Sequence, residues 1–281
     1  MSKIAVIGIV GNSVFLPVEK FHEGGETVEA SCVHFEPGGK GFNQAVAAAR
    51  CGADVSFLAA VGREYRKEFA DFLDNENISH TLVFKDEPTA FAAIVTDRTG
   101  SNHVTVYQGA QLSAHDVSLF EEEIKAANIL LLNNEVPEAV NIAAVMVAMK
   151  YGVKCILNPA PARKLDPLII DNVTLFTPNE HETLGINNKE NLIVTLGKRG
   201  CFIKSTGEIV PADNVGEVLD TTGAGDTFNG ALCAMLADGK DLAQAAKIAN
   251  GIASIGVTRR YAVSSIPSCS EISQVILKYS G

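Results

Sequence analysis

The sequence predicts an α/β fold in which a mostly parallel sheet is covered by helices on both faces. Short apolar runs that suit buried strands alternate along the chain with stretches of helical periodicity. The expected strands are residues 4–9, 55–60, 129–132, 155–157, 173–176 and 192–195. The expected helices are residues 43–50, 64–75, 116–127, 137–150, 226–237 and 242–255. Strands that alternate with helices in this way usually form a parallel sheet, because each helix returns the chain across it.

Two segments break this alternation and predict a second, smaller sheet. Residues 24–34 and 89–107 alternate polar and apolar side chains, which is typical of half-exposed antiparallel strands. The Asp-Arg-Thr-Gly sequence at 97–100 is a hairpin signal. Such a sheet is either a peripheral ribbon or a lid over a cleft, and these residues alone leave both interpretations open.

Length and composition exclude several classes of protein. The 281 residues, 47% hydrophobic and 20% charged, fit one soluble domain over residues 1–281 with a sizeable core. The formal net charge of -10, without basic blocks, argues against nucleic acid as a partner. No apolar run approaches the ~18 residues that cross a bilayer, and no cleavage signal follows the first one, so we expect no membrane partner. Scattered cysteines without a Cys-x-x-Cys pair indicate reduced thiols and a cytoplasmic location.

The first glycine-rich segment, Pro-Gly-Gly-Lys-Gly at 37–41, precedes the helix that runs to about residue 50. Glycines before a helix permit backbone angles closed to other residues and let main-chain N–H groups approach a ligand. Lys40 and Asn43 stand at the helix start, where they can donate hydrogen bonds to an oxygen-rich group. A tight strand-to-helix turn is the simpler interpretation, but it needs only one or two glycines. Three glycines and a lysine therefore favour a polar-ligand site.

The second segment, centred on Gly223-Ala224-Gly225-Asp226, is the stronger signal. It should open the next helix, whose unsatisfied N–H groups and positive dipole end form an anion hole. Asp226 lies in the first turn, where the dipole favours the ionised carboxylate. A helix N-cap would explain Asp226 but not the paired glycines beside it.

Neither segment carries an established nucleotide fingerprint. No Gly-x-x-x-x-Gly-Lys-Ser/Thr sequence occurs, so neither is a P-loop. Gly223 and Gly225 are followed by Phe228 where a dinucleotide-binding loop requires Gly or Ala. The six histidines show no zinc-ligand spacing.

Together, in this order and near these ends of the chain, the two segments resemble the two signatures of the ribokinase-like (PfkB) carbohydrate kinase family. Further similar segments are 24–28 (Gly-Gly-Glu-Thr-Val), 158–162 (Asn-Pro-Ala-Pro-Ala), 177–182 (Thr-Pro-Asn-Glu-His-Glu) and 195–200 (Thr-Leu-Gly-Lys-Arg-Gly). The resemblance covers nearly the whole chain. It implies a three-layer α/β sandwich with a small antiparallel β lid at about residues 12–35 and 88–108. It also implies ATP near the carboxyl half and a sugar beneath the lid.

The resemblance further implies a role for each matching residue. Asp226 would be the general base for the sugar hydroxyl, and Gly223, Ala224 and Gly225 would donate N–H groups to the transferred phosphoryl. The implied sugar ligands are Gly11, Ser13, Gly39, Lys40, Asn43 and Glu135. The residues implied around the nucleotide are Asn179, Thr195, Gly197, Gly200 and Asn250. Glu182, with Asn179, would place Mg²⁺, and Asp220, Thr222 and Ser265 would hold an activating cation such as K⁺.

Some positions depart from the family pattern. Gly11 and Ser13 stand where ribokinases carry an Asn and an Asp that grip the sugar hydroxyls. Charge-assisted hydrogen bonds of that kind are worth ~1.5–3 kcal/mol each, so we expect ribose binding to weaken by about tenfold or more. Asn12 would compensate only through a local shift. Tyr261 replaces a common Gly in the cation loop, and residues 183–191 are too short for the helix that ribokinases usually add there.

The first functional hypothesis is an ATP-dependent kinase that phosphorylates a primary hydroxyl of ribose or a similar pentose or polyol. A nucleoside kinase of the same fold is an alternative, because contacts to a base would offset the lost sugar ligand. A non-catalytic sugar or nucleotide sensor is a third, which the retained Asp226 disfavours. We also expect a homodimer formed through the lid, because its edge would otherwise remain unpaired.

Overall fold

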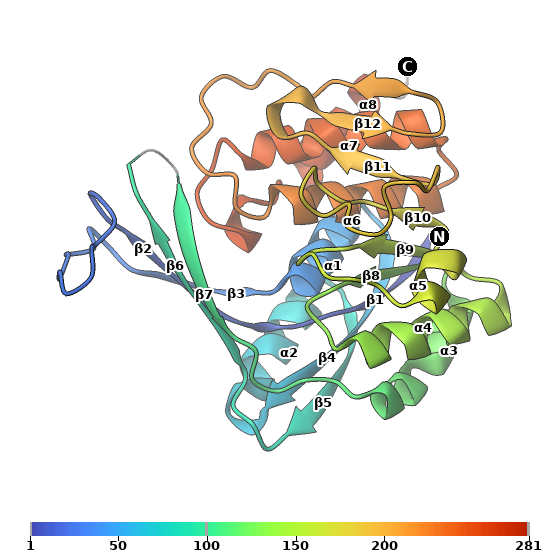
Figure 1. Cartoon of the computed structure of the whole chain (residues 1–281), viewed down its shortest axis with the longest axis horizontal. Helices are drawn as coiled ribbons and strands as arrows, with labels where there is room; N and C mark the ends of the chain where they lie inside the picture. The colour runs from blue at the N-terminus through green and yellow to red at the C-terminus, as the bar shows by residue number, and fades with distance from the viewer. Residues whose placement is uncertain (1, 99–100, 280–281) are drawn as a thin grey trace.

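A six-stranded parallel sheet forms the centre of the protein in the computed structural model, which describes residues 2–98 and 101–279 (Figure 1). Its strand order is β10-β9-β8-β1-β4-β5, and neighbouring strands run parallel throughout. The strands are β1 (Lys3–Ile7), β4 (Asp54–Gly62), β5 (Ser79–Lys85), β8 (Ile129–Asn133), β9 (Lys154–Asn158) and β10 (Leu175–Phe176). The expected parallel sheet is confirmed.

Helices cover both faces of this sheet (Figure 1). One face carries α1 (Lys40–Arg50), α2 (Arg66–Asn75), α6 (Ala224–Ala237), α7 (Leu242–Gly256) and α8 (Cys269–Tyr279), and the other carries α3 (Glu121–Ala126), α4 (Glu138–Tyr151) and α5 (Pro167–Asn172). Short 3₁₀ turns are η1 (Arg63–Tyr65), η2 (Ala114–Phe120), η3 (Gly197–Arg199) and η4 (Val263–Ser265). Within β1, Ile4 and Val6 pack into the first core, whereas Ala5 and Ile7 pack into the second. Burial on both faces requires continuously apolar strands, which explains the apolar runs in the sequence.

A second sheet, the lid, projects from one side of the molecule (Figure 1). It has four strands in the order β3-β2-β6-β7. They are β2 (Gly11–Pro17), β3 (His34–Gly38), β6 (Ala90–Thr96) and β7 (Asn102–Tyr107). β2 pairs antiparallel with β3 and parallel with β6, whereas β6 and β7 form the expected antiparallel pair. Thr99 and Gly100 of the hairpin signal lie outside the described residues.

The strand expected at residues 24–34 is wrong. That stretch is irregular except for a bridge between Val18 and Ala30 and for His34, where β3 begins. The exposed pair Gly24 and Gly25 forms a turn, with Gly25 at a φ of 85°. Alternation of polar and apolar residues was therefore a poor guide here, because no sheet face is buried along this stretch.

A third, antiparallel sheet consists of β11 (Ile193–Thr195), β12 (Cys201–Ile203) and β13 (Glu208–Val210). The run at 192–195 thus does not join the parallel sheet as expected, and isolated parallel bridges from Phe176 to Leu192 and from Asn179 to Thr195 connect it to that neighbourhood. Residues 183–191, all described, contain turns and no helix, as their length predicts. The sequence analysis did not identify β5 or α8.

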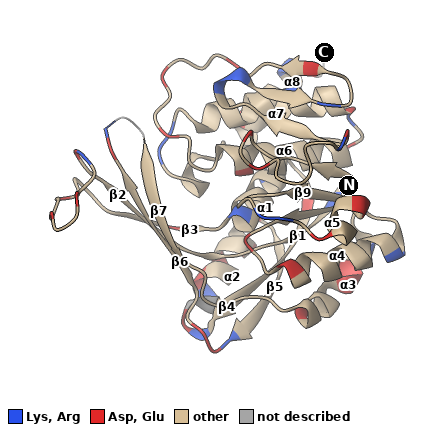
Figure 2. Ribbon diagram, viewed as in Figure 1, with Lys and Arg blue, Asp and Glu red and all other residues tan. Residues whose placement is uncertain are grey.

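Charged residues are distributed over the whole structure. Figure 2 shows acidic and basic positions interspersed along the ribbon. The six cysteines are free thiols. Among the described helices, none combines the length and the apolar character needed to cross a membrane.

Candidate active site

The two glycine-rich segments, far apart in the sequence, meet where α1 and α6 begin. Gly39 precedes α1 with a φ of 113°, and Gly223 precedes α6 with a φ of 77°. Both are backbone conformations that favour glycine. The two helices approach closely at Gly230, where an added Cβ would lie 2.3 Å from the carbonyl oxygen of Gln44. The predicted helix starts therefore face one site.

Asp226 is held by two side-chain amides of α1. Asn43 Nδ2 donates to one carboxylate oxygen and Gln44 Nε2 to the other, each at 3.1 Å. Gln44 Nε2 also lies 3.2 Å from Oδ1 of Asn158, at the end of β9. Asp226 is 6% exposed, so its carboxylate is positioned by these amides and only its edge meets solvent. Sequence reasoning identified Asp226 and Asn43 but missed Gln44, which belongs to no recognisable spacing pattern.

The start of α6 supplies fewer anion donors than expected. Asp226 lies in its first turn, as predicted. The N–H of Ala224, however, donates to the carbonyl oxygen of Thr221 at 3.2 Å. The first N–H groups of a helix have no acceptor inside it, which leaves those of Gly225 and Asp226 for an anion. Nothing lies within 4 Å of the Cβ position of Gly225, so this side of the helix start is open.

Lys40 introduces a positive charge among carboxylates. Its backbone N–H donates to Oε2 of Glu135, which follows β8, at 2.7 Å. The nearby carboxylate of Asp226, and to a smaller degree those of Glu135 and Glu182, raise the pKa of the Lys40 ammonium although burial lowers it. Burial raises the pKa of Glu135 to about 7, Lys40 opposes this shift and Asp226 adds to it. The site therefore combines a fixed cation with a carboxyl group that titrates near neutrality.

The lid places Gly11 and Ser13 on the side that faces the loop before η4. They share this face with Phe15, whose ring lies 5.0 Å from that of Tyr261. A Cβ at Gly11 would lie 2.3 Å from the carbonyl oxygen of Ala90 in β6, so the neighbouring strand excludes the Asn of the family pattern. Asn12 belongs to the opposite face of β2 and does not replace the missing ligand.

Two of the expected nucleotide residues, Asn179 and Thr195, lie beside each other through a parallel bridge. The N–H of Asn179 donates to Oε2 of Glu182 at 3.0 Å, and its Oδ1 accepts from the N–H of His181 at 2.8 Å. The expected Asn-x-x-Glu pair is thus a local turn, and the Glu182 carboxylate contributes to the raised pKa of Lys40.

The other residues expected around the nucleotide, Gly197, Gly200 and Asn250, have structural roles in the same region. Gly197 and Gly200 have φ values of 56° and 91°, and a Cβ at Gly200 would lie 2.0 Å from the carbonyl oxygen of Val210. Asn250 Nδ2 donates to that same carbonyl oxygen at 2.9 Å. Asn250 therefore fixes the end of β13 from α7, which is a supporting contact.

Asp220 and Thr222, two of the expected cation residues, are joined by a hydrogen bond. One Asp220 oxygen accepts from the N–H of Thr222 and the other from the N–H of Tyr261, each at 2.9 Å. Ser265 lies in the next turn, where its hydroxyl donates to the carbonyl oxygen of Ala262 at 2.7 Å. Tyr261 has a φ of 77°, which explains why glycine suits this position in the family pattern. Within residues 2–98 and 101–279, no three His, Cys, Asp or Glu side chains gather as a metal site.

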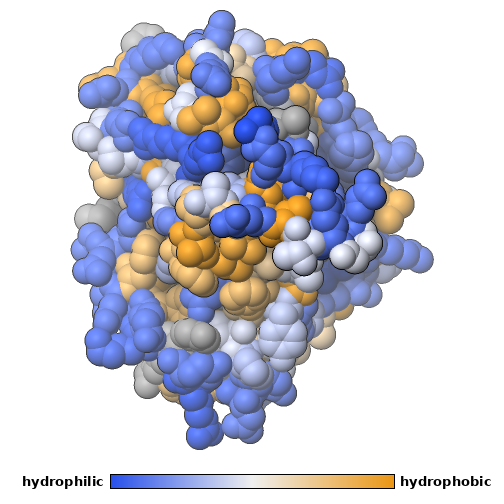
Figure 3. Space-filling model, turned by 90° about the vertical axis from the view of Figure 1, so that its left-hand side faces the viewer, coloured by the Kyte–Doolittle hydropathy of each residue, from blue (hydrophilic) through white to orange (hydrophobic). Residues whose placement is uncertain are grey.

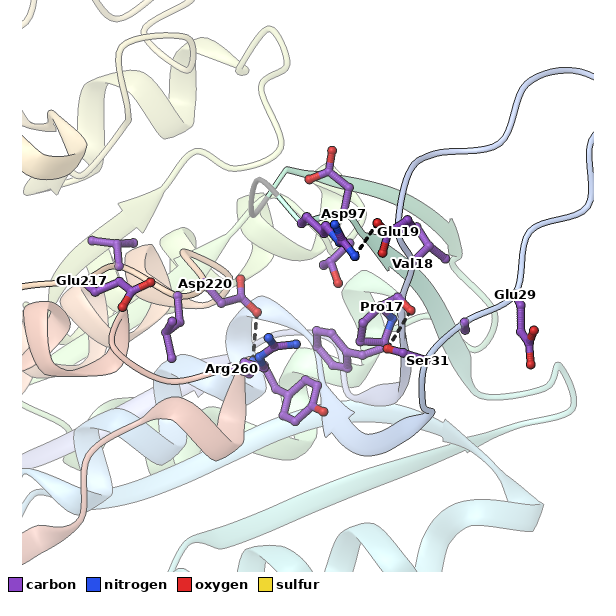
Figure 4. A pocket seen from close by; sticks show the side chains of 16 residues that line it. Pro17, Val18, Glu19, Glu29, Ser31, Asp97, Glu217, Asp220 and Arg260 are labelled. Atoms are coloured by element: carbon purple, nitrogen blue, oxygen red, sulfur yellow. Dashed lines mark hydrogen bonds and ion pairs between the residues drawn. The ribbon is translucent and has the colours of Figure 1, made fainter.

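A groove of about 560 Å³ lies between the lid and this loop (Figure 4). Asp220, Arg260 and Glu217 border it on one side, and Pro17 and Ser31 of the lid segment border it on the other. Its lining contains Phe15 and Tyr261 but none of Asp226, Lys40 and Glu135. The groove therefore shares Asp220 with the expected cation residues but does not include the proposed base.

Phe15, His34 and Tyr261 form an aromatic cluster that sequence reasoning missed. The ring of His34 stacks on that of Tyr261 with centroids 3.8 Å apart and an interplanar angle of 10°. Phe15 contacts both rings. In the sequence, only the departure of Tyr261 from the family pattern pointed to this cluster, because the three residues are distant from one another along the chain.

Comparison with known proteins agrees with this geometry. The pfkB family carbohydrate kinase profile matches residues 1–269. The ribokinase of Bacillus subtilis is 33% identical over 296 aligned positions, which cover 98% of this chain and 100% of that protein. The chain belongs to the pfkB family of carbohydrate kinases.

Solved structures extend the similarity to the fold. The structure of the Giardia lamblia ribokinase has a TM-score of 0.88 at 26% identity and covers 99% of each chain. The Cryptococcus neoformans ribokinase, solved in complex with ADP, has a TM-score of 0.83 at 26% identity, with 97% of this chain and 98% of that chain covered. The three-layer sandwich with a β lid is therefore a shared architecture.

Proposed function

We propose that this protein is an ATP-dependent kinase that transfers the γ-phosphoryl group to the primary hydroxyl of ribose or a similar pentose. The observation that carries the proposal is the position of Asp226 at the open start of α6, where the side-chain amides of Asn43 and Gln44 in α1 each donate to its carboxylate at 3.1 Å. The proposed base, the N–H groups that would bind the phosphoryl oxygens and a polar site for the acceptor thus lie together. The similar ribokinases support ribose as the first acceptor to test.

In the proposed reaction, the acceptor hydroxyl approaches the carboxylate of Asp226. The hydroxyl oxygen forms a bond to the γ-phosphorus while the bond from that phosphorus to the bridging oxygen of ADP breaks, and Asp226 takes the hydroxyl proton. The N–H groups of Gly225 and Asp226 face the charge that develops on the phosphoryl oxygens. Lys40 adds a nearby positive charge, and Glu135 accepts hydrogen bonds from other sugar hydroxyls when ionised. Such a reaction depends mainly on positioning and charge stabilisation.

We infer a magnesium requirement from the donor set. Glu182 and the side chain of Asn179 offer few oxygen ligands, which suits an ion that keeps several waters and binds mostly to substrate phosphates. Mg²⁺ would neutralise charge on the phosphates. Asp220 accepts backbone N–H groups from Thr222 and Tyr261 and retains further carboxylate lone pairs, so K⁺ activation stays a prediction to be measured with the same assay.

A nucleoside acceptor is favoured by one specific observation. Tyr261 is half-buried and lines the groove beside the lid face where Gly11 and Ser13 lack the sugar-gripping side chains. Aromatic faces attract flat bases, which would supply the binding energy that the short lid residues omit.

The test is an ATP-consumption assay coupled to ADP formation, run over pentoses, hexoses and nucleosides with and without K⁺. We expect turnover only when an acceptor is present, with ribose the preferred sugar. Preference for a nucleoside over every free sugar would show that the acceptor is a nucleoside and not ribose. Nucleotide binding without turnover on any acceptor would instead indicate a sensor.

We also propose a homodimer that forms through the outer face of the lid. Phe35, Phe91 and Tyr107 lie on that face and are 66%, 40% and 52% exposed. Figure 3 views the molecule from the lid side and shows an apolar area in the middle of this surface. Exposed aromatic residues on a sheet with free edges favour a protein partner. Sedimentation at micromolar concentration should give a dimer, and a monomer there would contradict the proposal.

A further inference from the structure

Glu36 is a buried carboxylate that the proposed reaction does not use. It lies in β3, three residues before Gly39, and is only 6% exposed. It stands directly opposite Ser13 in the lid, on the face that looks toward the active site. Burial of a carboxylate is costly unless hydrogen bonds compensate it, so its partners indicate its role.

The partners of Glu36 are backbone N–H groups of one loop. Oε1 accepts from Ala262 at 2.7 Å and from Val263 at 3.0 Å, and Oε2 accepts from the N–H of Ser264 at 3.1 Å. The hydroxyl of Ser264 donates to Oε2 as well, and Nε2 of His34 lies 3.3 Å from it. With these bonds made, Glu36 does not replace the missing sugar ligand at Ser13.

The same loop is held from its other end by Asp220, which accepts the N–H of Tyr261. Four consecutive N–H groups, from 261 to 264, therefore point at two carboxylates. Such a run of N–H groups forms an anion-binding concavity, here filled by side chains of the protein itself.

This loop forms the wall behind the start of α6. A Cβ added at Gly223 would lie 3.2 Å from Cα of Ala262, so the loop and the helix start are in contact. Gly223 is the N-cap of α6, and the N–H groups of Gly225 and Asp226, proposed to meet the phosphoryl oxygens, follow in the first turn of that helix. Glu36 thus connects the strand that leads into Gly39 and Lys40 with the loop that supports the phosphoryl site.

We propose that Glu36 is a positioning residue for the transfer reaction, which sets the loop at 261–264, and through it the start of α6, from the lid. The inference rests on the proposed kinase function. Catalysis of this type is sensitive to geometry, since a misplacement of about 1 Å can lower the rate by about a hundredfold. Loss of the Glu36 contacts should therefore lower kcat more than it raises the KM of either substrate.

The test variant is Glu36→Gln, which keeps the size of the side chain. Its oxygen can still accept from Ala262 and Val263, but its NH₂ group would face the N–H of Ser264. Asp116→Asn is the matched control, because Asp116 is also buried, at 7% exposure, and accepts from Ser113 N–H at 2.6 Å and Lys85 Nζ at 2.7 Å. Asp116 lies in η2, away from the active site, so its loss should affect stability alone.

We expect kcat of Glu36→Gln to fall by about tenfold to a hundredfold, with each KM within about threefold of the wild-type value. Asp116→Asn should keep the wild-type kcat even if its thermal midpoint falls as far as that of Glu36→Gln. Amide hydrogen exchange at 262–264 should be slow in the wild type and faster in Glu36→Gln. A kcat within twofold of wild type, or unchanged exchange at these amides, would overturn the inference.

The outcome can be separated from failure of the proposed function. If no acceptor is phosphorylated by the wild type, the proposed function is wrong. Slow ATP hydrolysis with water as acceptor, together with the exchange rates, then decides the role of Glu36. Equal rates of ATP hydrolysis by the wild type and Glu36→Gln would still overturn the inference that Glu36 is a positioning residue.

Discussion

Replacement of Asp226 by Asn removes the proposed base and leaves the shape of the site unchanged. The new amide cannot take the proton of the acceptor hydroxyl, so the rate of the chemical step should fall. A general base contributes ~10²–10⁴-fold to such a step, which corresponds to about 3–5 kcal/mol of barrier. We expect kcat of Asp226→Asn to fall within that range.

The structure predicts that this variant stays folded. Among the described residues, Asn43 Oδ1 and Gln44 Oε1 are buried without a hydrogen-bond partner. If the Asn43 amide rotates by 180°, its oxygen accepts from the new NH₂ group, while Gln44 keeps its bonds to position 226 and to Asn158, so both contacts to position 226 are kept. The remaining loss is the charge-assisted part of two hydrogen bonds, about 1–2 kcal/mol, or a fall of about 2–8 °C in Tm.

The assay is steady-state turnover with saturating ATP and acceptor, combined with thermal unfolding of each variant. Asn43→Ala is a useful companion, because it removes one amide and keeps the carboxylate. It should lower kcat less than Asp226→Asn does. Turnover of Asp226→Asn within threefold of wild type, in a folded protein, would refute the role of Asp226 as base.

Three further outcomes follow from the site and the core. Burial raises the pKa of Glu135 to about 7, so its carboxyl group is mostly ionised only above that pH, and kcat/KM for the sugar should rise with pH through about 7. Glu135→Gln should abolish this rise. A pH profile of the variant equal to that of the wild type would contradict the prediction. Gly230→Ala should destabilise the protein by ~1–3 kcal/mol in denaturant titrations, because the new Cβ would lie 2.3 Å from the carbonyl oxygen of Gln44. Gly256→Ala is the control and should be tolerated, because the nearest atom to its Cβ would lie 3.6 Å away. EDTA should abolish turnover and Mg²⁺ should restore it, and turnover that persists without divalent cations would show that the Glu182 carboxylate has another role.

The sequence was most informative where the backbone itself has a special requirement. The glycine-rich segments were singled out because glycine permits backbone angles closed to other residues, and Gly39 and Gly223 have φ values of 113° and 77°. Asp226 was identified because it follows such a glycine in the first helical turn. These features are local, so a short window of sequence contains the whole signal.

The missed residues act over long distances. Glu36 contacts a loop 226 residues later, and Gln44 contacts Asp226 across 182 positions. Neither residue has a neighbour in sequence that reveals the partner. Strand β2 of the lid was missed because it is buried along most of its length and shows little of the alternation that marks a half-exposed strand, whereas β6 and β7 lie within the expected segment 89–107.

The departure at Gly11 became interpretable only in three dimensions. The sequence showed that a sugar ligand is absent, and the contact with Ala90 shows that β6 leaves no room for one. We therefore expect the acceptor to be held by Lys40, Glu135 and the lid surface around Ser13.

Identification of the product of the reaction tests the central claim most directly. Wild-type protein would be incubated with ATP, Mg²⁺ and ribose, and the products would be resolved by ³¹P NMR and mass spectrometry. We predict equimolar ADP and a ribose monophosphate esterified at the primary hydroxyl, with neither formed by Asp226→Asn at a comparable rate. Release of inorganic phosphate without a sugar phosphate, for ribose and for every other acceptor tried, would contradict the account.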